Sequence, residues 1–161
     1  MFKVVDPKYF LDADRLDFMC KYLYVKSKSE GSNHRHYKSI YEEHIFKQTR
    51  GIEPTDMHII NQPRKNTVKD YTDSFDRLIN NFKTHGYNQD YPIHCNSIKR
   101  INGGAHRIAC ALYYKQQIPI VIHNDTETKH IWDRAWFESH SFPEEIIIEL
   151  EETFVKLSCN R

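Results

Sequence analysis

The sequence predicts an α/β (α+β) fold: a single domain with a small mixed sheet and additional helices at both ends. Stretches with apolar residues three and four positions apart, typical of amphipathic helices, surround short β-branched runs in the middle of the chain. The 161 residues are enough to enclose one hydrophobic core without disulfides or metals. No apolar run approaches the roughly 20 residues that span a membrane, so we expect a soluble protein.

Residues 1–50 are predicted to form a helical N-terminal extension, with two helices joined by the polar loop SKSEGSNHR. Gly51 follows the second helix, and residues 52–66 are expected to be extended or irregular because Pro54 and Pro63 disfavour helix. Helical spacing places these residues on buried faces: Leu16, Met19, Cys20 and Leu23 in the first helix, and Tyr37, Ile40, Tyr41 and His44 in the second. His44 is therefore interpreted as a packed histidine rather than a ligand.

Residues 52–123 hold the predicted core, in the order helix, strand, strand, helix, strand. YTDSFDRLINNFKTHG has the spacing of an amphipathic helix, which Asp73 or Ser74 can cap and which Gly86 ends. PIHCN and SIKRI are two short β-type runs, and the pair Asn102-Gly103 follows them. We therefore predict that the two runs pair as a hairpin.

A second amphipathic helix over about 105–115 and the strand IPIVIH, residues 118–123, complete this core. Residues 124–161 are expected to be helical, and SFPE at 141–144 is a Ser-x-x-Glu capping pattern for the last helix. Trp132 and Trp136 lie one helical turn apart, and we interpret them as core residues rather than as a stacking platform.

The stretch INGGAHRIACALYY, residues 101–114, carries the strongest functional signal. It places two glycines and two side chains that can carry positive charge, His106 and Arg107, where a helix begins. The free N–H groups of a helix N-terminus attract anions, and an arginine guanidinium suits phosphate oxygens. From these residues alone, a phosphate loop and a plain turn into the helix both remain open, because short glycine motifs match by chance.

The order of motifs in residues 52–123 resembles the ParB/sulfiredoxin superfamily. The shared pattern is an amphipathic helix ending in His-Gly, a Pro-Ile strand, Gly-Gly-x-His-Arg opening a helix, and an Ile-Pro-Ile-Val-Ile strand. Many members have Asp where this chain has Asn102. The resemblance implies a ParB/sulfiredoxin-like core in which these residues hold the phosphates of a nucleotide: Asn102, Gly103, Gly104, Ala105, His106 and Arg107.

Three activities occur in this superfamily. Sulfiredoxins carry a catalytic cysteine where this chain has Ala105, so their chemistry is disfavoured. Partition proteins continue into a DNA-binding domain, whereas the residues after 123 include the acidic run 144–152, which disfavours nucleic acid as a partner. Free-serine kinases use the same phosphate loop with an acidic base, and this activity fits the residues best.

The resemblance thus implies a kinase that uses ATP or ADP together with Mg²⁺. Glu53 is its predicted base, because serine kinases of this fold carry an acidic residue near this place, and Glu42 or Glu43 is the alternative. His106 is the second predicted catalytic residue. Lys69 is predicted to contact the nucleotide phosphates, and Lys65 could reach them too. The alternative for both lysines is a solvated position without a ligand.

A second resemblance concerns the whole chain. RLDFMCKYLY, YEEHI, a Gly-Ile-Glu turn and NGGAHRIACALYY are together similar to a group of small proteins from bacterial surface-polysaccharide gene clusters. The predicted function is therefore a nucleotide-dependent phosphotransferase acting on a small, serine-like hydroxyl compound in capsule or surface polysaccharide biosynthesis. The alternatives are a nucleotide-binding, ParB-like regulatory or partition-type protein without catalysis, and a helper subunit that has lost its chemistry.

Charge and cysteine content limit the partners and the compartment. With 23 basic and 22 acidic residues, the chain has no global field that would draw it to nucleic acid or to anionic membranes. The four cysteines form no CxxC pair and the N-terminus has no apolar signal region, so we expect reduced thiols and a cytoplasmic protein. The ten histidines complete no zinc spacing, no metal ligand is predicted, and a homodimer is left open.

Overall fold

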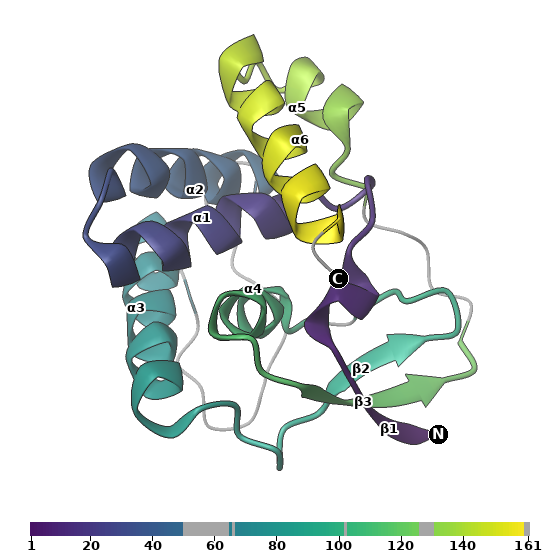
Figure 1. The fold of residues 1–161 in the computed structure, drawn as a ribbon. Helices are drawn as coiled ribbons and strands as arrows, with labels where there is room; N and C mark the ends of the chain where they lie inside the picture. Colours follow the sequence, from purple (N-terminus) through teal and green to yellow (C-terminus); the bar gives the residue numbers. More distant parts are fainter. Residues whose placement is uncertain (50–64, 66, 102, 126–130, 160–161) are drawn as a thin grey trace.

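The computed structural model describes residues 1–49, 65, 67–101, 103–125 and 131–159. Within these ranges it has six α-helices, one 3-10 helix and three strands, which confirms the predicted α+β class (Figure 1). The elements are β1 (Phe2–Val5), the 3-10 helix η1 (Pro7–Phe10), α1 (Asp17–Glu30), α2 (His34–Gln48), α3 (Val68–His85), β2 (Ile93–Asn96), α4 (Ala105–Tyr114), β3 (Ile118–His123), α5 (Arg134–Ser139) and α6 (Glu144–Cys159). None of these helices has the length and apolar character needed to cross a membrane.

The sheet is mixed, with the strand order β1-β3-β2. β2 runs parallel to β3, with Ile93 opposite Ile120, and β1 runs antiparallel to β3, with Val5 opposite Ile118. β3 occupies the centre and its first three residues are buried, as its β-branched composition predicts. The sequence patterns do not predict β1, because four residues are too few to reveal a period.

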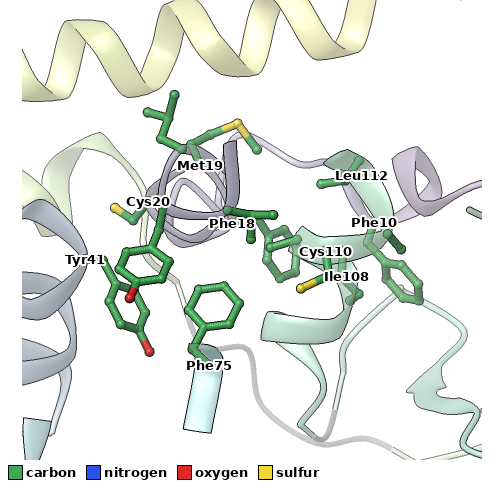
Figure 2. Close-up of a cluster of buried hydrophobic side chains, with 14 of the residues drawn as sticks. Phe10, Phe18, Met19, Cys20, Tyr41, Phe75, Ile108, Cys110 and Leu112 are labelled. Carbon is green, nitrogen blue, oxygen red and sulfur yellow. The ribbon is translucent and has the colours of Figure 1, made fainter. Parts of the chain in front are cut away.

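The helices lie on one side of the sheet (Figure 1), and α1 packs closely on both α4 and α2. The centre of the hydrophobic core lies where α1, α2, α3 and α4 meet, and Figure 2 shows Phe18, Tyr41, Phe75 and Ile108 there. The predicted inner faces of the first two helices are buried, apart from Tyr37, which is partly exposed. All four cysteine thiols are free.

α3 begins earlier than its sequence pattern indicates. Thr67 is the N-cap: its hydroxyl accepts a hydrogen bond from the N–H of Asp70 at 3.1 Å, and the Asp70 carboxylate accepts one from the N–H of Thr67 at 2.9 Å. This reciprocal capping box starts the helix nearly two turns before the predicted caps, Asp73 and Ser74, which lie inside it. Gly86 ends the helix with φ of 74°, as predicted.

The predicted second strand of the hairpin after β2 is wrong, because SIKRI forms a turn that ends in a single antiparallel bridge. The Asn96 side chain accepts hydrogen bonds from the N–H groups of Ile98, at 3.1 Å, and Arg100, at 3.0 Å. Lys99 has φ of 63°, which interrupts extended backbone. The chain still turns back on itself: the N–H of Asn96 donates to the carbonyl oxygen of Arg100 at 2.9 Å, and an antiparallel bridge joins Cys95 to Ile101. The Asn96 side chain takes the other N–H groups of the turn, so the pairing does not extend into a strand.

The C-terminal segment contributes two helices, α5 and α6, as predicted. Trp132 and Trp136 are partly buried and pack against the core, which confirms their interpretation as core residues. Trp132 precedes α5, so the two indoles do not share a single helix. Trp136 stacks on His140, with ring centroids 4.0 Å apart.

Candidate functional site at the start of helix α4

α4 begins at Ala105, directly after two glycines with left-handed backbone. The φ angles are 80° at Gly103 and 93° at Gly104. A Cβ atom on Gly104 would lie 2.5 Å from Cδ1 of Ile93 in β2, so the end of the buried Ile93 side chain would have to move to admit a side chain there. Gly104 is the N-cap and has no side chain to offer, so no side chain among the described residues caps the first-turn N–H groups of α4. The helix dipole places partial positive charge at this end.

Arg107 joins the start of α4 to the loop that precedes β2. Its Nη1 donates a hydrogen bond to the carbonyl oxygen of Tyr91 at 2.7 Å and lies 3.4 Å from the hydroxyl of Tyr87. Its Nη2 lies beside Gly104, 3.2 Å from the place that a Cβ atom would take. The sequence predicts a phosphate ligand here, whereas the structure shows that Nη1 already holds the loop. Nη2 remains next to the glycine turn.

His106 lies in the first turn of α4 and contacts side chains from two other helices. The hydroxyl oxygen of Tyr41, from α2, lies 2.8 Å from His106 Nε2, at hydrogen-bond distance. Phe75 of α3 packs edge-on against the imidazole, with ring centroids 4.6 Å apart, and also contacts the Tyr41 ring. The imidazole is therefore fixed at the junction of α2, α3 and α4.

His106 is uncharged at neutral pH. Burial lowers its pKa well below the ordinary histidine value, and the charges of Lys21 and Lys65 lower it further. Burial also raises the pKa of Tyr41 well above its ordinary value, so the hydroxyl keeps its proton. His106 therefore adds a polar group, but no positive charge, to the start of α4.

A buried ion cluster at the N-terminal end of α1 is a feature that the sequence does not predict. Arg15 donates two hydrogen bonds to the Asp17 carboxylate, at 2.8 and 2.9 Å, and Lys21 Nζ donates one at 3.1 Å. Asp17 is 1% exposed and Lys21 is 2% exposed. Burial alone would raise the pKa of Asp17, but the charges of Lys21 and Arg15 hold it well below its usual range.

This cluster contributes positive charge near His106. Its three side chains carry two positive charges and one negative charge, and Lys21 has the largest charge effect on the pKa of His106. The sequence signal for it is weak: Asp17 and Lys21 form an i, i+4 pair, which usually lies on a solvated face. Their burial follows from the packing of α1 against α4 and α2.

His44 is packed in the core, as predicted, and is 0% exposed. Its ring stacks on Phe137, with centroids 5.6 Å apart, and lies 5.3 Å from the Trp136 ring. Within the described residues, neither of its ring nitrogens has a hydrogen-bond partner. Burial lowers the pKa of His44 to about 3, and Lys21 acts in the same direction.

The two lysines that precede or open α3 lie in different surroundings. Lys69 is on the exposed side of the helix and is hydrogen-bonded to Asp73, which favours the solvated interpretation over phosphate contact. Lys65 is partly buried, with Nζ 4.9 Å from the centroid of the Tyr71 ring, and burial lowers its pKa. The charge of Lys65 also lowers the pKa of His106, in the first turn of α4, whereas Lys69 is not among the groups with the largest effects on that pKa.

Of the three glutamates predicted as possible bases, two lie on α2. Glu53 and Asn102 lie outside the described residues. Glu42 accepts a hydrogen bond from the Thr72 hydroxyl at 3.0 Å, and Glu43 forms an ion pair with Lys47 at 2.6 Å. Both carboxylates line one open depression over α2 and the start of α3.

Among the described residues, no group of three His, Cys, Asp or Glu side chains is placed to hold a metal ion. Comparisons of the chain with protein family models, with curated proteins and with solved structures give no match. The membership of the ParB/sulfiredoxin superfamily therefore stays a prediction from sequence motifs. A function has to be inferred from the geometry at the start of α4.

Proposed function

We propose that this protein is a nucleotide-dependent phosphotransferase that acts on a small hydroxyl compound, with the start of α4 as its phosphate-binding element. One observation carries the proposal: within the described residues, the first-turn N–H groups after Gly103 and Gly104 have no side-chain cap, and the charges of Lys21 and Lys65 act on His106 in the same turn. Backbone donors, a helix dipole and nearby cations together favour an anion such as a phosphate.

The remaining roles follow the sequence resemblance. Mg²⁺ bound between the phosphates of ATP or ADP would neutralise their charge, as in other phosphoryl transfer reactions. Glu53 is the proposed base for the hydroxyl proton of the acceptor. Arg107 Nη2, next to Gly104, is available to a phosphate oxygen while Nη1 holds the loop. The acceptor is a serine-like or sugar-related precursor of a surface polysaccharide, and the reaction takes place in the cytoplasm.

The first test is nucleotide binding, measured as the shift in melting temperature with ATP, ADP, GTP and CTP, each with and without Mg²⁺. A nucleotide at about 100 times its dissociation constant stabilises the fold by roughly 2.7 kcal/mol. Lys65→Gln and Lys69→Gln form a matched pair, since both remove a lysine near the start of α3. We expect Lys65→Gln to weaken binding by about tenfold or more, which corresponds to a lost charge-assisted hydrogen bond, and Lys69→Gln to leave it unchanged.

The second test is turnover. ³¹P NMR of the protein with ATP or ADP, Mg²⁺ and a panel of hydroxyl compounds that includes serine should detect a phosphorylated product. Glu53→Gln should abolish the product while nucleotide affinity stays the same. Selective binding of CTP without any product would instead support a regulatory or partition-type protein. If no nucleotide at millimolar concentration shifts the melting temperature, the proposed function is wrong.

A further inference from the structure

We propose that Tyr41 fixes the tautomer of His106, so that the imidazole presents its Nδ1–H group as a hydrogen-bond donor to an acceptor oxygen bound at the start of α4. Tyr41 is a positioning residue in this proposal, and His106 is the residue that meets the ligand. The identification of that oxygen as a phosphate oxygen rests on the proposed function. The tautomer rests on the geometry of the two side chains.

The hydrogen bond between Tyr41 and His106 can form in two ways. Either the tyrosine O–H donates to Nε2, or an Nε2–H group donates to the tyrosine oxygen. Within the described residues, His106 is the one hydrogen-bond partner of the Tyr41 hydroxyl, and Tyr41 is 0% exposed. In the second arrangement the hydroxyl proton would be buried without an acceptor, and an unpaired buried donor is strongly unfavourable. The first arrangement therefore holds, and Nε2 carries no proton.

The proton of the neutral ring must then sit on Nδ1. His106 is neutral because burial and two nearby lysines lower its pKa. The residue is partly exposed, and Nδ1 is not one of the buried polar atoms that lack a partner. Since Nδ1 also forms no hydrogen bond within the described residues, its N–H group is a donor that a ligand can reach.

The position of the Tyr41 hydroxyl is set by rigid neighbours. The Tyr41 ring packs against Tyr24, with centroids 4.8 Å apart, and against Phe75, at 5.2 Å (Figure 2 labels Tyr41 and Phe75). Phe75 contacts the His106 ring as well. This aromatic packing leaves the hydroxyl little freedom, so the acceptor at Nε2 is satisfied in advance of ligand binding. Because Nε2 already accepts this hydrogen bond, it is not free to act as a general base. His106 is therefore a binding residue in this proposal.

Long-range ¹H–¹⁵N NMR of the histidine side chains tests the tautomer directly, because protonated and unprotonated ring nitrogens resonate in separate ranges. The signals of His106 are assigned by their loss in His106→Gln. At neutral pH and without ligand, we expect a protonated Nδ1 and an unprotonated Nε2. Tyr41→Phe keeps the ring but removes the hydroxyl, and should shift the population toward Nε2–H. Tyr24→Phe is the matched control: its hydroxyl bonds to Asp76, so the His106 signals should not change.

Titration with ATP and Mg²⁺ separates this inference from the proposed function. We expect ATP to shift the Nδ1 signal of His106, and Tyr41→Phe to weaken ATP binding about threefold to tenfold, as the loss of one neutral hydrogen bond does. A protonated Nε2 in the wild-type protein, or the same tautomer in Tyr41→Phe, would overturn the inference even if ATP binds. If no nucleotide binds but the tautomer is as described, the assignment of the tautomer stands and the proposed function fails.

Discussion

Replacing His44 by leucine should remove part of the acid sensitivity of the fold. The pKa of His44 is lowered to about 3 in the folded protein, whereas an unfolded chain has the ordinary value of about 6.5. As the pH falls below about 6.5, the unfolded state binds a proton at this position and the folded state does not. The folded state is therefore stabilised at neutral pH and loses stability progressively as the medium becomes acidic.

The size of the effect follows from the two pKa values. Between about pH 7 and about pH 4.5, protonation of His44 in the unfolded state alone lowers the free energy of unfolding by about 2.5 kcal/mol. His106, whose pKa is also lowered, acts in the same direction and stays in the variant. Between these two pH values, the wild type should therefore lose about 2.5 kcal/mol more free energy of unfolding than His44→Leu loses.

At neutral pH the variant should have about the stability of the wild type. The leucine loses ring contacts with Phe137 and Trp136, which contribute about 0.5–1.5 kcal/mol per pair. It also removes two buried nitrogens that lack partners within the described residues, each of which costs about 1–3 kcal/mol. These contributions oppose each other, so the main effect of the substitution is on the pH dependence.

Urea unfolding followed by tryptophan fluorescence measures the free energy at each pH. The control is His85→Asn, which removes a histidine that lies exposed on α3 instead of one in the core. If the wild type and His44→Leu lose the same free energy between the two pH values, His44 does not titrate as its burial indicates, and the explanation is wrong.

Three further substitutions test the packing around the site, each by urea unfolding. Gly104→Ala should lower the free energy of unfolding by more than about 2 kcal/mol, because it adds a collision with the buried Ile93 side chain to a left-handed φ. Gly31→Ala, with φ of 70° and open space, should lower it by about 1 kcal/mol, and equal losses would contradict the collision. Thr67→Ala should cost about 1 kcal/mol through loss of the capping box, and no change would mean that the box is not formed in solution. Asp17→Asn should lower the free energy of unfolding by about 3–5 kcal/mol, because it leaves two buried cations without their carboxylate. Lys21→Met should lower it by less, and the reverse order would refute the proposed charge balance.

Local patterns predicted the elements that depend on nearby residues. β3 has the bounds of IPIVIH, α4 begins after the glycine pair, and Gly86 ends α3, because composition and backbone freedom act within a few positions. The second strand of the predicted hairpin did not form because one side-chain oxygen, Asn96 Oδ1, accepts the hydrogen bonds of two backbone N–H groups in the turn. Capping by Thr67 was missed because the helical period is visible only from Tyr71 onward.

The site was less predictable because its contacts join distant parts of the chain. The glycine turn and His106 are visible in the sequence, but the partner of the imidazole, Tyr41, lies 65 residues away. The burial of Lys21 and Asp17 depends on two helices packing over α1, and no period in the sequence marks a charged pair as buried. The hydrogen bond from Arg107 to the Tyr91 carbonyl was not predictable, because every residue has a backbone carbonyl and no sequence pattern marks this one. The phosphate contact of Arg107 stays a prediction.

The Arg107 guanidinium lies between the glycine turn and the loop before β2, so a bound phosphate and this loop would compete for its N–H groups. A phosphate that recruited Nη1 would take it from the Tyr91 carbonyl, and the exposed Tyr91 ring would then lose the tether that holds its backbone against α4. Binding of a phosphate at Nη1 would therefore loosen the loop before β2, and hydrogen exchange of its amides would become faster.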